Sequence, residues 1–199
     1  EQSVMKTLTD ITPYTDYVKK LQSIIDGDKQ EDEILDVEEE EVTYESYTAD
    51  DFLHDVYMDE ERYNTLKALL LTKKNVILQG APGVGKTFAA KRLAFSIMGE
   101  KDNNRVKMVQ FHQSYSYEDF IMGFRPTETG FELKKGVFYE FCRKAAEDDR
   151  PYFFIIDEIN RGNLSKIFGE LFMLIESDKR GVELQLLYAD EQFSIPSNV

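Results

Sequence analysis

Apolar residues follow two different spacings along the chain, and these spacings predict alternating strands and helices. Short continuous apolar runs at residues 76–78, 106–111 and 152–156 are typical of buried strands. At residues 88–98 and 164–175, apolar residues recur every three or four positions, which predicts helices that pack on one face. Strands that alternate with helices in this order predict an α/β fold with three layers, in which a parallel central sheet lies between helices.

Capping residues predict where several helices begin and end. Thr48 precedes a short segment with apolar residues on one face, and a second helix is expected from Asp59 to near Lys74, before the first strand. Gly99 is a typical stop signal for the helix at 88–98, and Asn163 is a cap for the helix that follows it.

Alternating apolar and polar residues predict two hairpins among the helices. Residues 130–141 alternate about a turn at residues 134–136 and run into a helix that ends near Asp149. Residues 182–195 contain a second such pattern around a polar turn. We expect the first hairpin to be an insertion that projects from the helical layer.

The N-terminal part of the chain differs from the remainder. Residues 13–25 place apolar side chains on one helical face and predict one amphipathic helix. The acidic run at residues 28–45 cannot bury enough apolar surface to order itself, which indicates a linker. We therefore expect an N-terminal extension at residues 1–46 and a folded domain at residues 47–199.

The strongest chemical signal is a glycine-rich turn between the first predicted strand and its helix. Its glycines let consecutive backbone N–H groups point at one anion, and the start of the helix adds the positive end of its dipole. Lys86 can reach the terminal phosphates of a nucleotide, and Thr87 can hold Mg²⁺ through its hydroxyl. A turn that binds nothing is the alternative, but strand, loop and helix occur in the order that a phosphate-binding loop requires. The predicted phosphate-binding residues are Gly80, Ala81, Pro82, Gly83, Val84, Gly85, Lys86, Thr87 and Phe88.

Two acids follow directly after the third predicted strand. Asp157 is expected to orient Mg²⁺ together with Thr87, and Glu158 to polarise the attacking water. Two acids at the end of a strand mean little alone, but a phosphate-binding loop upstream favours the functional interpretation. With Lys86, they form the predicted catalytic set.

Several further residues are weaker candidates. Asn160 and Arg161 are candidates for nucleotide sensing or inter-subunit contact, although an arginine that only braces Glu158 or Asn160 is the alternative. Residues 47–52 are a candidate pocket for the nucleotide base. His112 opens an aromatic and hydroxyl-rich loop at residues 112–126, where open α/β sheets bind ligands, but a structural histidine is the more frequent case.

Charge is unevenly distributed, which limits what it says about binding partners. The net charge is −14, but residues 26–60 hold 16 acidic residues and one lysine, which leaves 22 acidic and 23 basic residues elsewhere. The folded part is therefore nearly neutral. The single cysteine, Cys142, excludes an intrachain disulfide and is expected to be a packed side chain. Because no apolar run approaches the ~18 residues that span a bilayer, we expect a soluble, cytoplasmic protein without membrane contact.

The motifs resemble the McrB family, the GTP-hydrolysing AAA+ component of modification-dependent restriction systems. The resemblance runs from about Tyr47 to Val199 and rests on NVILQGAPGVGKTFAAKRLA, VQFHQSYSYEDFIMGFRP and FFIIDEINRGNLSKIFGELFMLIESDKRG. MoxR-type and dynein-like ATPases share the DEIN element and the two hairpins, whereas the QFHQSYSYEDF block resembles McrB.

The resemblance implies an AAA+ P-loop NTPase with Mg²⁺ as cofactor and GTP, or ATP, as substrate. Lys86 and Thr87 match the phosphate and Mg²⁺ contacts of the family, Asp157 the Mg²⁺-orienting acid and Glu158 the water-activating acid. The resemblance also implies a homo-oligomeric ring, expected to be a hexamer, a McrC-like nuclease subunit, and DNA contacts through parts that this sequence does not contain.

Family members continue into a strand with a polar sensor motif, an arginine-bearing segment and a helical lid, whereas this sequence ends at Val199. A sheet that lacks a central strand leaves an edge unpaired and the core open. We therefore expect that these 199 residues alone do not turn over nucleotide. The alternatives are a MoxR-like ATP-dependent remodelling chaperone and a nucleotide-binding fragment without turnover.

Overall fold

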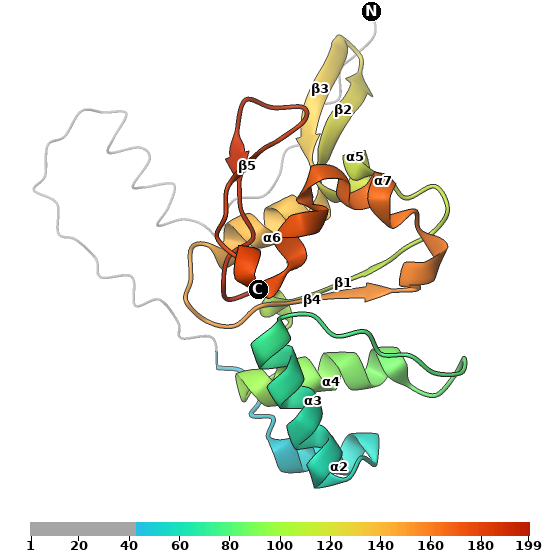
Figure 1. The fold of residues 1–199 in the computed structure, drawn as a ribbon, viewed down its shortest axis with the longest axis vertical. Coiled ribbons are helices and arrows are strands. Elements are labelled where there is room, and N and C mark those ends of the chain that lie inside the picture. Colours follow the sequence, from blue (N-terminus) through green and yellow to red (C-terminus); the bar gives the residue numbers. More distant parts are fainter. Residues whose placement is uncertain (1–42) are drawn as a thin grey trace, which may run out of the picture. The chain divides into compact units, whose positions relative to one another are not determined.

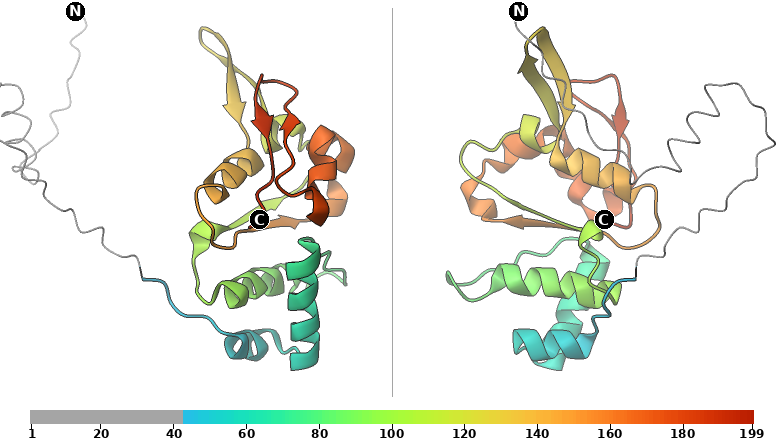
Figure 2. Two further views of the ribbon diagram at one scale, coloured as in Figure 1. Left: turned by 60° about the vertical axis from the view of Figure 1, so that its left-hand side comes forward. Right: turned by 180° about the vertical axis from the view of Figure 1, so that it is seen from behind.

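A parallel pair of strands lies at the centre of the structure (Figure 1). β1 (Val106–Gln110) pairs with β4 (Phe153–Asp157). In the computed structural model, which describes residues 43–199, α4 (Lys86–Met98) lies on one side of this pair and α6 (Val137–Ala145) on the other (Figure 2). The predicted α/β class and its parallel sheet between helices are confirmed.

Residues 1–42 lie outside the described residues. The amphipathic helix expected at residues 13–25 and most of the acidic linker fall in this range. The boundary expected after residue 46 stays a prediction. Residues 43–199 form one compact unit, and no helix in it is long and apolar enough to cross a bilayer.

The caps of the first helices agree with the sequence. Thr48 begins α2 (Ala49–Val56) with a capping box, in which its hydroxyl accepts from the Asp51 N–H while the Asp51 carboxylate accepts from Thr48. Asp59 caps α3 (Glu60–Lys73) by accepting from the backbone of the first turn. Both starts were predicted.

Gly99 ends α4 in the left-handed conformation with φ 78°, and its N–H donates to Phe95 O. The predicted stop is therefore confirmed. The connection from α4 to β1 contains the 3₁₀ turn η2 (Asn103–Arg105).

The first predicted strand is wrong. Residues 75–79 belong to no strand or sheet, and Ile77 is 78% exposed. A strand needs a neighbour for its backbone hydrogen bonds, and β4 pairs only with β1 in the described part of the chain. The apolar run is therefore not hydrogen-bonded to the sheet of β1 and β4.

The first hairpin lies earlier than predicted. β2 (Met122–Thr127) pairs with β3 (Gly130–Lys135), so the turn falls at residues 128–129 and not at 134–136. Residues 112–126 were predicted to be a loop, but they contain α5 (Tyr117–Phe120) and most of β2. Beyond β3 the alternation has no strand partner, and the chain enters α6 instead.

The second predicted hairpin is present in a shorter form, as β5 (Leu184–Gln185) and β6 (Gln192–Phe193). The hairpin of β2 and β3 extends away from the parallel pair (Figures 1 and 2).

The helix expected at residues 164–175 is interrupted. α7 (Leu164–Phe168) is capped by Asn163 as predicted, but Gly169 has φ 53° and the chain continues as the 3₁₀ helix η4 (Gly169–Ile175). η3 (Ile159–Arg161) and η5 (Ser177–Lys179) are shorter 3₁₀ turns on either side. The predicted apolar face is nevertheless buried, because Ile167, Phe168, Leu171 and Leu174 all lie in the core.

The two larger of three hydrophobic clusters in the described residues hold most of the helices in place. The larger centres on Phe120, which stacks on Phe138 with ring centroids 4.7 Å apart and meets Phe154 of β4 edge-on. The smaller joins α2 and α3 to α4 through Phe52 and Tyr63. Such aromatic pairs bury large areas in fixed geometry, which anchors α5 and α6 to the sheet.

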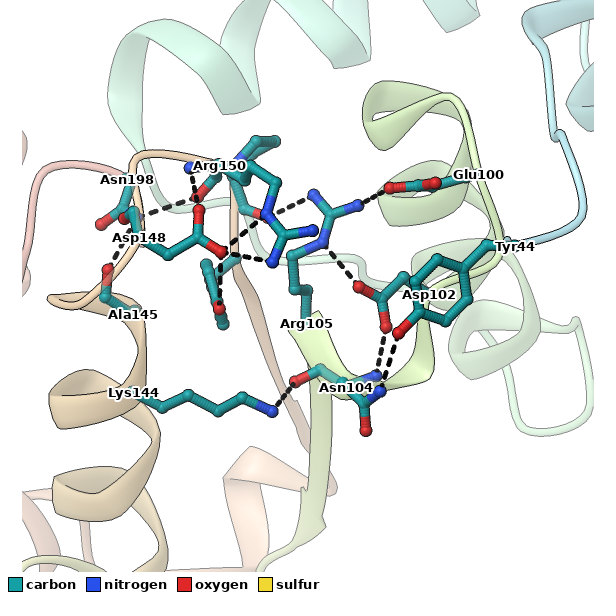
Figure 3. A network of polar contacts seen from close by, with 12 residues as sticks. Tyr44, Glu100, Asp102, Asn104, Arg105, Lys144, Ala145, Asp148, Arg150 and Asn198 are labelled. Carbon is teal, nitrogen blue, oxygen red and sulfur yellow. Dashed lines mark hydrogen bonds and ion pairs between the residues drawn. The ribbon is translucent and has the colours of Figure 1, made fainter. Parts of the chain in front are cut away.

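A polar network crosses the amino ends of the two strands (Figure 3). The buried Arg105 donates from Nε to Asp102 at 2.8 Å, contacts Glu100, and donates from Nη1 to Pro151 O at 3.4 Å. The Asn198 amide donates to carbonyls at the end of α6 and in the α6–β4 connection, including that of Ala145 at 2.9 Å. These bonds satisfy backbone groups that burial would otherwise leave unpaired.

Candidate functional site

The predicted phosphate loop has the backbone that anion binding requires. Gly83 and Gly85 have φ values of 78° and 79°, in the left-handed region that glycine adopts without strain. Gly85 directly precedes the first residue of α4. The loop therefore presents the N-terminus of a 13-residue helix, where free N–H groups and the helix dipole favour an anion.

Lys86 lies folded over this loop. Its Nζ donates to Gly80 O at 3.0 Å and to Ala81 O at 2.9 Å. The ammonium is therefore already held at the loop, where it can exchange these carbonyls for phosphate oxygens.

The two predicted Mg²⁺ ligands come together across 70 residues of sequence. Thr87 Oγ1 donates to Asp157 Oδ1 at 3.2 Å, and the same oxygen accepts from the Glu158 N–H at 3.1 Å. Parallel pairing places Gln110 opposite Asp157, so the acid stands at the carboxyl end of the sheet. This is the edge at which open α/β sheets bind ligands.

These two oxygen donors fit Mg²⁺. That ion usually takes few protein ligands and completes its octahedron with water and substrate phosphates. Within residues 43–199, no group of three or more His, Cys, Asp or Glu side chains is gathered as a metal cage. Thr87 and Asp157 would hold the ion, which would neutralise phosphate charge when bound.

Glu158 is positioned by its backbone and by Arg161. Its φ of 52° lies in the left-handed region, which is uncommon for a residue other than glycine, and it is the N-cap residue that precedes η3. Arg161 Nε donates to Glu158 Oε2 at 3.0 Å. Of the two interpretations of Arg161, the structure therefore contains the brace on Glu158.

His112 and Asn160 meet at a cavity beside these acids. The cavity is lined by His112, Gln113 and Ser114 after β1, and by Asn160 and Arg161 after β4. The His112 ring packs edge-on against Tyr115. The predicted loop and the residues after the acids thus lie side by side.

The candidate base pocket at residues 47–52 is partly closed. Tyr47 and Phe52 are 3% and 0% exposed and belong to the smaller core. The Tyr47 hydroxyl donates to Asp55 at 2.9 Å, and burial raises the pKa of this tyrosine. Neither ring is therefore open to a nucleotide base.

Arg92 is a residue near the site that the sequence interpretation missed. Its guanidinium lies 3.3 Å from the centre of the half-exposed Phe88 ring, and its Nε donates to Asp55 at 2.9 Å. The hydrogen bond from Arg92 is the main cause that lowers the pKa of Asp55. The spacing of four residues between Phe88 and Arg92 on one helix was the available signal.

Cys142 is inert packing, as expected. It is 1% exposed within α6, and burial raises the pKa of its thiol. A thiol without thiolate character is a poor nucleophile.

A sequence profile of the AAA domain (dynein-related subfamily) matches residues 75–193, more than half of the chain. The chain belongs to this family. The match begins just before the phosphate loop and includes both acids, so the residues that meet in the site belong to the AAA domain.

Two curated proteins are similar to this AAA domain. The "Type IV methyl-directed restriction enzyme EcoKMcrB subunit" of Escherichia coli (strain K12) is 55% identical over 161 residues, which cover 78% of this chain and 35% of that protein. The "Type II restriction enzyme BsuMI component YdiS" of Bacillus subtilis (strain 168) is 29% identical over 136 residues, which cover 54% of this chain and 39% of that protein. The resemblance to the McrB family is confirmed. The chain spans little more than a third of the length of each relative.

Proposed function

We propose that this chain carries the nucleotide-binding core of a motor in a McrBC-like restriction system, which binds and hydrolyses GTP, or ATP, with Mg²⁺. The observation that carries the proposal is the contact between Thr87 and Asp157, with Glu158 as the next residue. It unites a phosphate loop, two Mg²⁺ ligands and a candidate water-activating acid at one sheet edge.

Each residue has a distinct role in this proposal. Lys86 and the loop N–H groups bind the phosphates, and Thr87 and Asp157 hold Mg²⁺. Glu158 accepts a hydrogen bond from the attacking water once its carboxylate is released from Arg161. In the proposed homo-oligomeric ring, expected to be a hexamer in the cytoplasm, a cation from a neighbouring subunit completes the neutralisation of charge.

The restriction assignment rests on the relatives. Both relatives are named as components of restriction enzymes, and the 55% identity to the McrB subunit extends over 78% of this chain. A McrC-like nuclease subunit and DNA contacts through other parts of the assembly belong to the same proposal. A remodelling chaperone remains the alternative from another class, and a clear ATP preference would favour it.

We also propose that a further strand completes this sheet. The free edge of β4 borders an apolar groove of about 150 Å³ beside Leu70, Ile156 and Val199. Arg180 projects into it, and its buried Nε has no hydrogen-bond partner among the described residues. A strand seated there would pair the β4 edge and offer an acceptor to Arg180.

Nucleotide binding tests the proposed site directly. We expect the purified chain to bind Mg²⁺–GTP or Mg²⁺–ATP in a calorimetric titration, and Lys86→Ala to weaken this binding by about 100-fold because charge-assisted phosphate contacts are lost. Lys134→Ala, which removes an exposed lysine from β3, is the matched control and should bind as the wild type does.

Comparing the affinities for GTP and ATP in the same titrations tests the substrate preference. If neither nucleotide bound to the wild-type chain at millimolar concentration, the proposal would be refuted.

A further inference from the structure

The segment at the start of the folded unit is fastened to the end of α4. We name residues 44–47 the strap. The Tyr47 N–H donates to Gly99 O at 3.0 Å and the Lys101 N–H donates to Glu45 O at 2.8 Å, which are the two bonds of a short antiparallel bridge. The Lys101 ammonium also pairs with the Glu45 carboxylate at 2.6 Å. The strap is therefore held in one register against the residues that follow α4.

Tyr44 connects the strap to the polar network at the amino end of β1. Asn104 Nδ2 donates to the Tyr44 hydroxyl at 3.0 Å, and the Asn104 N–H donates to Asp102 Oδ1 at 2.8 Å (Figure 3). Asp102 in turn accepts from the buried Arg105. The strap therefore rests on a network of paired polar groups, which makes its support rigid.

Tyr47 connects the strap to the other end of α4. Its ring is buried in the smaller core, and its hydroxyl donates to Asp55 Oδ2 at 2.9 Å. The same carboxylate oxygen accepts from Arg92 Nε at 2.9 Å. Asp55 belongs to α2, whereas Arg92 lies in the second turn of α4. One carboxylate oxygen therefore joins the strap to the half of α4 that follows the phosphate loop.

Arg92 holds the residue that follows Thr87. Its guanidinium lies 3.3 Å from the centre of the Phe88 ring, which is a cation–π contact between residues one helical turn apart. Phe88 is half-exposed and belongs to none of the hydrophobic clusters in the described residues. The position of its ring therefore depends on Arg92 rather than on the core. Thr87, the proposed Mg²⁺ ligand, directly precedes this ring.

We propose that docking of the strap is coupled to Mg²⁺–nucleotide binding at the phosphate loop, and that Asp55 and Arg92 are the positioning residues that carry this coupling. When the strap is docked, Tyr47 fixes the Asp55 carboxylate. Arg92 then holds Phe88 and the first turn of α4 in the arrangement that receives the nucleotide. Coupling between two sites is reciprocal, so the nucleotide stabilises the docked strap as much as the docked strap favours the nucleotide. This inference rests on the proposed function.

The position of the strap gives this coupling a regulatory role. The folded unit begins at Thr43, so a pull on the chain before it acts on the strap first. A strap that is pulled from its bridge releases Tyr47 and lowers the affinity for nucleotide. Bound nucleotide, in turn, makes the strap resist the pull.

Amide hydrogen exchange, read by NMR on the full 199-residue chain, tests the effect of nucleotide on the strap. The readouts are the N–H groups of Tyr47 and Lys101, which bond across the bridge. We expect saturating Mg²⁺–GTP or Mg²⁺–ATP, whichever binds more tightly, to slow both exchange rates by at least about fivefold. The control is the Gly181 N–H, which donates to Ile195 O at 2.8 Å beside the second hairpin. Equal slowing at Gly181, or unchanged exchange at the strap, would overturn the coupling.

Nucleotide affinity tests the coupling in the reverse direction. Lys101→Glu places two carboxylates against each other at the strap and should weaken binding by about fivefold in a calorimetric titration. Adding Glu45→Lys restores an ion pair with exchanged partners and should recover the affinity. Lys134→Glu, the same charge change at an exposed position of β3, is the matched control and should bind as the wild type does. Equal affinity of Lys101→Glu and wild type, or a loss that Glu45→Lys does not recover, would contradict the coupling.

Arg92→Lys and Asp55→Asn test the two positioning residues. Arg92→Lys keeps the positive charge but loses the planar guanidinium that contacts Asp55 and Phe88 together. In this variant, saturating nucleotide should no longer slow exchange at Tyr47. Asp55→Asn keeps the shape of the side chain and should give the same result, so the outcome does not depend on the folding of one variant. Slowing as large as in the wild type would remove the substituted residue from the path.

The outcomes distinguish this inference from the proposed function. A wild-type chain that binds neither nucleotide refutes the proposed function and the coupling with it. A chain that binds nucleotide while exchange at the strap stays unchanged refutes the coupling alone.

Discussion

Gly162 is the residue that allows the loop after β1 and the loop after β4 to contact each other. An added Cβ would lie 2.6 Å from Ile167 Cδ1 and 2.9 Å from Phe111, both of which are fully buried. Because both side chains are held in the core, neither can move aside as a flexible side chain at the surface could. The backbone of the site therefore depends on Gly162 having no side chain.

Gly162→Ala should therefore destabilise the chain by about 1–3 kcal/mol, because a close-packed core accommodates an added carbon only by moving. Urea unfolding measures the change. The exposed Ser165→Ala, three residues further along the chain, is the control and should stay within about 0.5 kcal/mol of the wild type. Equal stability of Gly162→Ala and wild type would show that the loops can separate without cost.

The helix caps are elements that the sequence determines locally. Thr48 and Asp51 exchange hydrogen bonds over three residues, so the signal for α2 is contained in a four-residue pattern. The phosphate loop was predicted for the same reason, because its glycines and Lys86 are adjacent in sequence.

Elements that depend on distant partners were not predictable in the same way. The run at residues 76–78 is apolar enough for a strand, but only a neighbouring strand makes it one. The turn of the first hairpin was misplaced because its register depends on β2, where Phe124 faces Leu133. The contact between Arg161 and Glu158 was one of two open alternatives, since sequence spacing does not fix where an exposed guanidinium rests.

Thr48→Ala tests the contribution of the cap to α2. We expect a loss of about 1 kcal/mol in the free energy of unfolding, since two backbone or side-chain bonds of the first turn disappear. Thr65→Ala, on the exposed side of α3, is the control and should be neutral or slightly stabilising because alanine favours a helix. Both are measured by chemical unfolding, and an equal result for the two variants would contradict the role of the cap.

The connection from α6 to β4 should make stability depend on acid pH. The Arg150 side chain donates to Asp148 Oδ2 at 2.6 Å and lowers the pKa of that carboxyl from 3.8 to about 2. A lowered pKa in the folded state gives stability that is complete above pH ~4 and is lost as the pH falls from 3.8 toward 2. The stability difference between wild type and Asp148→Asn should therefore shrink from pH 7 to pH 3.

Thermal unfolding across this pH range measures that difference. The control is Asp149→Asn, which removes the adjacent exposed carboxylate and no ion pair within the described residues. A pH-independent difference for Asp148→Asn would show that the pair with Arg150 does not form in solution.

In the whole folded unit, the candidate site and the supporting polar network lie at opposite ends of the parallel strands. The carboxyl ends of β1 and β4 carry Asp157, Glu158 and the cavity lined by residues 112–114 and 160–161. The amino ends carry the Arg105 network, which ties the α4–β1 connection to the start of β4 (Figure 3). The free edge of β4 is the part of this architecture that remains open to a further strand.

This open edge leads to an expectation for the isolated chain. We expect the purified 199 residues to bind nucleotide without turnover. The unpaired sheet edge leaves Asp157 and Glu158 on an incomplete sheet, and no neighbouring subunit supplies a cation. Phosphate release measured over several hours should equal that of the Lys86→Ala variant. Robust hydrolysis by the isolated chain would refute this expectation.

The single thiol of Cys142 can report on local opening of the region around α6. It is buried at the junction of α6 with the larger core, so an aromatic disulfide reagent can react with it only after that region opens. The labelling rate then measures the opening free energy without any introduced probe. A ligand that stabilises the sheet against opening should lower the labelling rate of Cys142. A ligand that binds only at the surface should leave this rate unchanged.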